Sequence, residues 1–298
     1  MSFKNIFNDV VIENPTEKFL EFCLERHSVF KKKEAGLPKP WTNDEILQKH
    51  KFTNLFRDLD RVSVFIFDWI EPLKDDIEPL FANLLYARNC NKTSTLEKTG
   101  WIIDADGKVQ DEQKFLNTIE EIGGVFTKGW KNSVWGGAYM VAGTFGPKLG
   151  YRQREQMIIN YIPKKIAELT QIILDHNCNP DITELLDKLC EAWGYRNLMV
   201  FTQWLLDIAH IRPDILPPTI RPPVLSGVEP LHVVFGINDP EELIAHAQQA
   251  WNDRYPDERR MEFKDAEHAL CEFRKYTAWK LGIQRPKPYK PHHLKKRK

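Results

Sequence analysis

The sequence lacks a net charge, paired cysteines and long apolar runs. Its 298 residues carry 42 Lys and Arg against 42 Asp and Glu, so composition gives no overall signal for a polyanionic partner. The five cysteines form no CxxC pair, which argues against a structural zinc site or a disulfide framework and favours a reducing compartment. No run approaches the 18 apolar residues of a membrane span, and acids interrupt the N-terminus. We therefore expect a cytosolic protein with no membrane partner.

Apolar residues recur at helical spacing along most of the chain, which predicts an all-α protein. A proline-rich segment, 212–230, predicts an extended connection. Thr42, with Glu45 three residues later, matches a capping box. The expected helices cover residues 15–33, 52–70, 77–89, 111–122, 138–141, 152–174, 182–193, 198–209, 239–251 and 264–281.

The charge is unevenly distributed at the C-terminus. No acid follows Glu272, whereas ten Lys and Arg residues do. We expect a single helical catalytic domain over residues 1–284, with two lobes meeting at a cleft as the alternative, and a basic tail over 285–298. The tail is either a disordered, solvated segment or an electrostatic contact for nucleic acid.

A first polar row lies on the expected helix 52–70. Asn54, Arg57 and Arg61 stand at i, i+3 and i+7, with Thr53 and Asp60 beside them, so they share one side of a helix whose other side is apolar. The row is either a solvated face with internal ion pairs or a site for phosphate, which a guanidinium group can bind through two oxygens.

A second polar row lies on the expected helix 264–281. Its members are Asp265, His268, Glu272, Lys275 and Tyr276, which fall within about 100° of arc on a helix. The pKa values of these side-chain types span the range needed to move protons near neutral pH. A divalent metal held by the first three is an alternative, although their spacing matches no established ligand pattern. Cys271, within the same segment, is either a packing thiol or a nucleophile.

Four segments carry a resemblance to a known family. The segments beginning at Glu25 (ERHSVFKKK), Pro40 (PWTNDEIL) and Phe52 (FTNLFRDLDR) resemble the N-terminal signature of amino acid:DNA transferases, first described as α-glutamyl/putrescinyl-thymine pyrophosphorylases. The segment DAEHALCEFRKY, beginning at Asp265, is similar to that family's C-terminal motif. The helical domain of 5-hydroxymethyluracil DNA kinases is a relative, but the sequence has no GxxxxGK[ST] motif, which disfavours a kinase.

The resemblance implies a DNA glycosylase-like, helix–hairpin–helix related fold. Residues 189–207 are similar to the hairpin region, although only Gly194 is present where the usual pattern has Gly-x-Gly. Gln203 and Asp207 on the following helix would then face the pocket.

The implied reaction is hypermodification of thymine in bacteriophage DNA, in the host cytoplasm. An amino acid or polyamine displaces pyrophosphate from 5-pyrophosphoryloxymethyluracil, with the target base flipped out of the duplex. Arg26, Arg57, Arg61 and Lys275 would stabilise the leaving pyrophosphate, and Asp265, His268 or Glu272 would accept the proton of the amine. Trp41 or Tyr276 would stack on the base. Substrate contacts are also expected from Thr42, Asn54, Asp60, Gln203, Glu267 and Cys271.

Two other functions fit parts of this pattern. A glycosylase-like base excision enzyme would use Asp207 to stabilise an oxocarbenium ion. A non-enzymatic helical DNA-binding accessory protein would need the polar rows only for affinity.

Overall fold

The computed structural model describes residues 7, 11–123, 134–136, 154–223 and 228–282, and no β-strand occurs among them. The all-α prediction is confirmed for these residues. None of the described helices combines the length and apolarity needed to cross a bilayer. The predicted helix 138–141 and the basic tail 285–298 lie outside the described residues.

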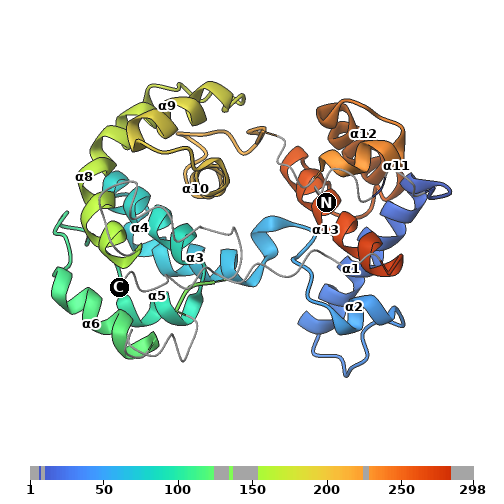
Figure 1. Ribbon diagram of the computed structural model, residues 1–298, viewed down its shortest axis with the longest axis horizontal. Coiled ribbons are helices and arrows are strands. Elements are labelled where there is room, and N and C mark those ends of the chain that lie inside the picture. The colour runs from blue at the N-terminus through green and yellow to red at the C-terminus, as the bar shows by residue number, and fades with distance from the viewer. Residues whose placement is uncertain (1–6, 8–10, 124–133, 137–153, 224–227, 283–298) are drawn as a thin grey trace, which may run out of the picture. The chain divides into compact units, whose positions relative to one another are not determined.

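The chain divides into two compact units (Figure 1). Among the described residues, unit 1 combines the N-terminal residues up to Asp60 with residues 221–223 and 228–282, and unit 2 contains those between 61 and 220. Because unit 1 is built from both ends, the N-terminal and C-terminal segments that resemble one family lie in the same unit.

Unit 1 is organised around the α1, α12 and α13 helices, whose facing sides are rich in aromatic rings. Phe19 and Phe273 meet edge to face with ring centroids 5.6 Å apart, and Phe22 lies 4.9 Å from Tyr276. Such ring pairs add specific geometry to the burial of apolar area. The helices of unit 1 are α1 (Pro15–Glu34), α2 (Glu45–Lys49), η2 (Arg57–Leu59), η6 (Glu229–Leu231), α11 (His232–Phe235), α12 (Pro240–Arg254) and α13 (Phe263–Lys280).

Unit 2 is built around α4, which is buried along almost its whole length and packs against α8 and α10. The indole of Trp204 fixes α10 to α4 by donating to the carbonyl of Phe81 at 2.9 Å. The helices of unit 2 are α3 (Arg61–Ile70), η3 (Glu71–Leu73), α4 (Ile77–Cys90), α5 (Thr93–Thr99), α6 (Glu112–Gly123), α8 (Arg154–Leu174), α9 (Thr183–Trp193) and α10 (Leu198–Ile211).

A turn at Gly194 ends α9, and the chain then leads into α10. Gly194 adopts φ +77°, and the amides of Gly194 and Tyr195 bond back to the carbonyls of Glu191 and Cys190. This pattern is a Schellman motif, in which the left-handed residue is glycine because a Cβ would be strained there.

Two local predictions were wrong. The helix expected over 52–70 begins only at Arg61, and residues 52–60 form an irregular segment with one 3₁₀ turn. Asn54 explains part of the difference, because its side-chain oxygen accepts from the amide of Phe56 and so stabilises a turn. The N-cap of α2 is Asp44 rather than Thr42, since Asp44 Oδ1 accepts from the amides of Ile46 and Leu47.

A buried ion pair joins α4 to α10. Arg88 donates to both carboxylate oxygens of Asp207 at 2.5 and 2.6 Å and to Ser63 Oγ at 3.0 Å. The side chains of Arg88 and Asp207 are 1% and 0% exposed. A buried pair of this kind is sensitive to the loss of one partner, because the other charge is left without compensation.

We therefore expect Arg88→Met to lower the free energy of unfolding by about 3–5 kcal/mol, measured by urea denaturation. Arg88→Met/Asp207→Asn, which also removes the stranded charge, should lose less. The control is Lys188→Ala, which breaks an exposed pair with Glu184 in the same unit and should cost far less. A single variant no less stable than the double variant would contradict the assignment.

Candidate functional site

The polar row of α13 faces the irregular segment 51–60, so part of the first predicted row meets the second within unit 1. The row was placed on a helix correctly, since α13 spans Phe263–Lys280. Its side chains bond to backbone and side-chain atoms of the segment at Lys51, Thr53 and Arg57. Residues more than 200 positions apart in the sequence thereby form one cluster.

Asp265 fixes the start of α13 to this segment. Oδ2 of its carboxylate accepts from the amide of Glu262 at 3.1 Å and completes a capping box, and Oδ1 accepts from the amide of Arg57 at 3.3 Å. Burial raises the pKa of Asp265 to about 6, and the two backbone amides act in the opposite direction. Both carboxylate oxygens are therefore used to hold backbone in place.

His268 lies next along the row, against Thr53. Its Nε2 is 2.6 Å from Thr53 Oγ1. Burial lowers the pKa of His268, with a further lowering from the Arg57 and Lys275 charges, whereas Glu272 and Asp60 raise it. The net direction leaves the imidazole neutral at pH 7, which is the form that can accept a proton.

Glu272 and Lys275 lie one turn further along. Oε2 of Glu272 accepts from the Thr53 amide and from Lys275 Nζ, both at 3.1 Å. Lys275 also donates to the carbonyl of Lys51, and its Nζ lies 4.5 Å from the centroid of the Phe52 ring. These two side chains are 15% and 17% exposed, so the pair sits at the edge of the cluster where solvent or a ligand can reach it.

Arg26 on α1 also contacts the irregular segment, so a third element contributes to the cluster. Its Nη2 donates to the carbonyl of Phe52 at 2.9 Å. Burial lowers the pKa of Arg26, and the charges of Glu272 and Asp60 act in the opposite direction. Because a guanidinium group stays protonated even with a lowered pKa, Arg26 supplies a fixed positive charge beside these carboxylates.

The first predicted row is only partly brought into this cluster. Asn54 and Arg57 are 4% and 8% exposed, so the solvated-face interpretation is wrong for both. Asp60 completes unit 1, whereas Arg61 begins α3, is exposed and belongs to unit 2.

Gln203 and Asp207 are also in unit 2, buried on α10. The carboxylate of Asp207 accepts two hydrogen bonds from Arg88 in the buried core of unit 2. The residues therefore occupy a different unit from His268 and Glu272.

Tyr276 ends the predicted row and bonds to Asp44, a residue that the sequence did not single out. Its hydroxyl donates to Asp44 Oδ2 at 2.6 Å. Burial is the largest cause that raises the pKa of Tyr276, and the hydrogen bond to Asp44 and the charge of Asp44 raise it further.

Thr42 accepts from the amide of Asp44 at 3.0 Å. Trp41 donates to the Leu37 carbonyl, with Lys39 Nζ 5.0 Å from its ring centroid. Asp44 was detectable as an N-cap residue type shortly before the apolar pair at 46 and 47.

Glu267 and Cys271 lie on α13 and are partly exposed. Burial of the sulfur raises the pKa of Cys271 to about 11, and the Glu267 charge adds to this. The Cys271 thiol is thus protonated at neutral pH, which makes it a weak nucleophile. All five cysteines are free thiols.

The polar row of α13 does not have the arrangement of a metal site. Among the residues that the structure describes, no group of three His, Cys, Asp or Glu side chains is arranged to hold a metal ion. Asp265, His268 and Glu272 instead bond to Arg57 and Thr53.

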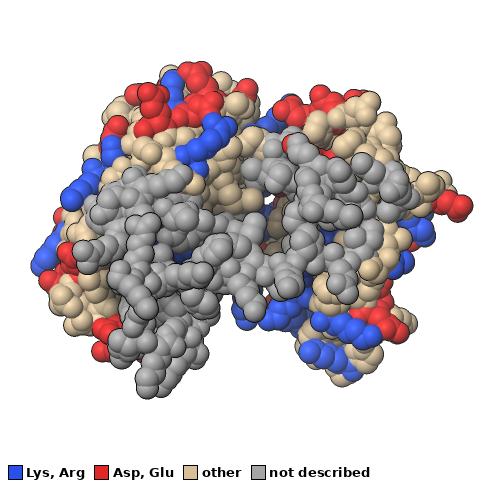
Figure 2. Space-filling view, viewed as in Figure 1, with Lys and Arg blue, Asp and Glu red and all other residues tan. Residues whose placement is uncertain are grey.

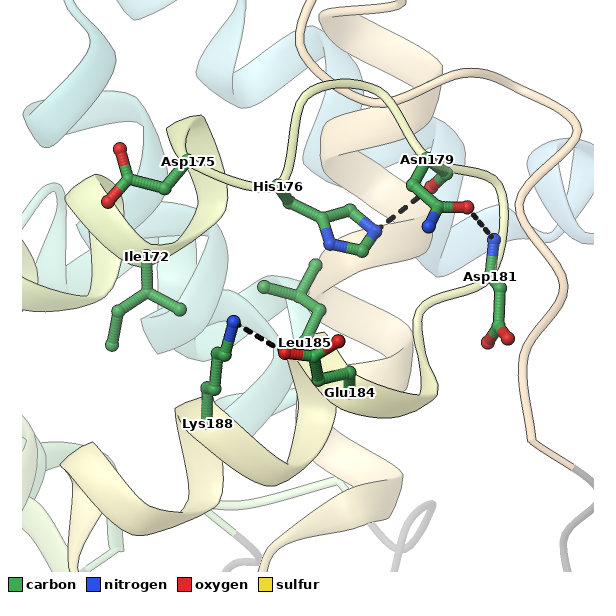
Figure 3. Close-up of a pocket in the computed structure, with 8 residues that line it drawn as sticks. All are labelled: Ile172, Asp175, His176, Asn179, Asp181, Glu184, Leu185 and Lys188. Atoms are coloured by element: carbon green, nitrogen blue, oxygen red, sulfur yellow. Dashed lines mark hydrogen bonds and ion pairs between the residues drawn. The ribbon is translucent and has the colours of Figure 1, made fainter.

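An open pocket of about 460 Å³ is found in unit 2, not at this cluster (Figure 3). It lies where the end of α8 leads into α9, and polar side chains dominate its lining. In Figure 3, His176 bonds to the Asn179 carbonyl and Lys188 pairs with Glu184, at 3.0 and 2.7 Å. We do not assign the chemistry to it, because its lining groups pair with their sequence neighbours and none belongs to either predicted row.

A family model described as "5-hmdU DNA kinase, helical domain" matches residues 13–202. This range includes Arg26, Asn54 and Arg57 and ends before α13. No curated protein and no solved structure matches the chain.

The position of Asp265 predicts a specific pH dependence of stability. Its pKa is about 6 in the folded protein against an ordinary value of 3.8, so the folded protein binds the proton more tightly than the unfolded chain. The resulting stabilisation is present below pH ~4 and is lost as the pH rises through 6. At 1.36 kcal/mol per pKa unit, its upper bound is roughly 3 kcal/mol.

We expect the stability of the wild type, relative to Asp265→Asn, to fall between pH 4 and pH 7 in urea denaturation series. Asp257→Asn, at an exposed carboxylate of the same unit, is the matched control. A difference that is constant or that grows with pH would mean that Asp265 is not held in a buried site.

Proposed function

Since the chain belongs to the family of the helical domain of 5-hmdU DNA kinases, we propose that it is a DNA base-modifying transferase. Its substrate is DNA in which 5-hydroxymethyluracil carries a pyrophosphate ester, and its second substrate is an amino acid or polyamine. The amine nitrogen forms a bond to the exocyclic methylene carbon, and the bond from that carbon to the pyrophosphate oxygen breaks. The ammonium proton passes to the protein, and pyrophosphate leaves. The reaction takes place in the cytoplasm.

The observation that carries this proposal is the contact between Thr53 and both His268 and Glu272. It joins a segment inside the family match to α13, whose polar row contains an imidazole and two carboxylates. Phosphoryl transfer from ATP is not part of the proposal, because the 298 residues contain no GxxxxGK[ST] motif.

The positive side of the cluster suits the leaving group. Negative charge grows on pyrophosphate as the bond to carbon breaks, and fixed positive groups stabilise that change. Arg26, Arg57 and Lys275 are the proposed donors, with Arg57 close enough to His268 to lower its pKa. A guanidinium group can bind two phosphate oxygens at once.

The acidic side of the cluster suits the amine. A neutral His268 accepts the ammonium proton at Nε2, either directly or through the hydroxyl of Thr53. Glu272 binds the ammonium before its proton is lost and then stabilises the imidazolium, which it already favours by its charge. Asp265 and Asn54 are positioning residues in this scheme, because their oxygens bond to backbone amides.

We further propose that the α9–α10 pair is the hairpin of a glycosylase-like, helix–hairpin–helix related fold that contacts DNA while the target base is flipped out. The Gly194 turn between these helices supports this assignment. A base excision reaction is not favoured, since Asp207, which would stabilise the oxocarbenium ion, is fully buried and paired with Arg88.

The test is a product assay on DNA containing pyrophosphorylated hydroxymethyluracil, incubated with a mixture of amino acids and polyamines. Mass spectrometry of the digested nucleosides identifies a new 5-substituted thymidine, and pyrophosphate is measured in parallel. No new nucleoside from intact substrate would refute the transferase. Free base with abasic DNA would indicate excision, and DNA binding without products would indicate an accessory protein.

We expect His268→Asn and Glu272→Gln to lower the rate of nucleoside formation about 10²- to 10⁴-fold, the usual effect of removing general base catalysis. Binding of the DNA should change little, since neither side chain is a proposed phosphate contact. Glu168→Gln, at an exposed glutamate of α8 in unit 2, should leave the rate unchanged. A rate within a fewfold of the wild type in both α13 variants would remove them from the mechanism.

A further inference from the structure

The polar row of α13 continues to Trp279. Asp265, His268, Glu272, Lys275 and Trp279 are separated by 3, 4, 3 and 4 residues, which keeps all five on one side of a helix. With a rise of 1.5 Å per residue, Trp279 lies about 6 Å beyond Lys275 and about 10 Å beyond Glu272 along the axis. A large apolar ring therefore ends a row whose other members are charged or polar.

The indole of Trp279 is partly exposed and packs against a second ring. It stacks on the imidazole of His50 with ring centroids 4.0 Å apart and an angle of 19° between the planes. The residue remains 41% exposed, and Leu281 beside it is 45% exposed. An aromatic ring supported on one side and open on the other is the geometry by which proteins stack on unpaired bases.

Lysines adjoin both stacked rings in the sequence, and one of them, Lys49, is paired with the exposed Glu45 at 2.6 Å. Residues 31–51 include α2 and His50. They contain six lysines and three acidic residues, whereas the whole chain has no net charge. Lys49 and Lys51 flank His50, and Lys280 follows Trp279, all three exposed. Figure 2 shows Lys and Arg side chains gathered over the part of unit 1 where Figure 1 places α2.

We propose that Trp279, His50, Lys49, Lys51 and Lys280 form a single-strand binding face, which stacks an unpaired DNA base on Trp279 and binds its flanking phosphates with the lysines. The proposal rests on the proposed function in taking DNA as the partner. It adds the surface that holds the strand next to the cluster of His268 and Glu272. The distance of about 10 Å from Glu272 to Trp279 spans a few nucleotides, since stacked bases are about 3.4 Å apart along a strand.

The test uses fluorescence anisotropy of a labelled single-stranded oligothymidylate, with the full chain and no modified base. We expect Trp279→Ala to weaken binding about 5- to 100-fold, the effect of losing one stacked base, and Trp279→Phe to retain most of the affinity. Lys49→Ala/Lys51→Ala should make the slope of log affinity against log salt shallower by about 1.4, from two lost phosphate contacts.

The matched control is Lys98→Ala/Lys164→Ala, which removes two exposed lysines of unit 2. Circular dichroism checks that each variant is folded. Affinity unchanged in Trp279→Ala overturns the stacking role, and equal salt slopes in the two lysine pairs overturn the location of the face. Because the oligonucleotide is unmodified, these results are independent of the nucleoside product assay. A wild type that forms product while Trp279→Ala binds normally refutes only this face, and the reverse pattern refutes only the transferase.

Discussion

The structure of unit 1 depends on α13 supplying the hydrogen-bond partners of the segment 51–57. The amides of Thr53 and Arg57 donate to Glu272 and Asp265, and the carbonyl of Lys51 accepts from Lys275. A backbone group buried without a partner costs free energy comparable to a lost hydrogen bond, so a segment with irregular backbone can be buried only where such partners exist. The same side chains that hold this segment are the ones that carry ionisable groups. The α13 side chains that stabilise the backbone of this segment are therefore also the ionisable groups of the candidate site.

Burial decides which of these ionisable groups suits which step. Desolvation raises the pKa of the Asp265 carboxyl and lowers that of the His268 imidazole, and both shifts favour the uncharged form. Both oxygens of Asp265 accept from backbone amides, whereas the Nε2 atom of His268 bonds to a hydroxyl group among the described residues. A hydroxyl can exchange its donor and acceptor roles, so a proton can move at His268 without breaking the backbone contacts that Asp265 maintains. This is why the proton acceptor is assigned to His268 within a row that also offers two carboxylates.

The sequence predicts those features of the molecule that follow from local periodicity. The helices around Phe19, Leu85 and Trp204 have apolar residues at helical spacing, and the row on α13 is readable because a regular helix holds it. The first row could not be predicted correctly, since its apolar spacing also fits a helix while its amides are bound by residues over 200 positions away. The partner of Asp207 was equally hidden, because Arg88 lies on a helix 119 residues earlier. Periodicity carries no information about such distant polar pairs.

The family match covers part of the proposed site, and the α13 row lies outside it. The matched residues, 13–202, contain Arg26 and Arg57, two of the proposed donors to the leaving group. The α13 helix, outside the matched range, carries His268 and Glu272 on the amine side and Trp279 beyond them. A kinase and a transferase that act in succession on one base must both bind a phosphorylated methylene group, but only the transferase must deprotonate an amine. In the proposed scheme the positive groups come from both segments, since Lys275 lies on α13, whereas the groups that take the proton from the amine lie on α13 alone.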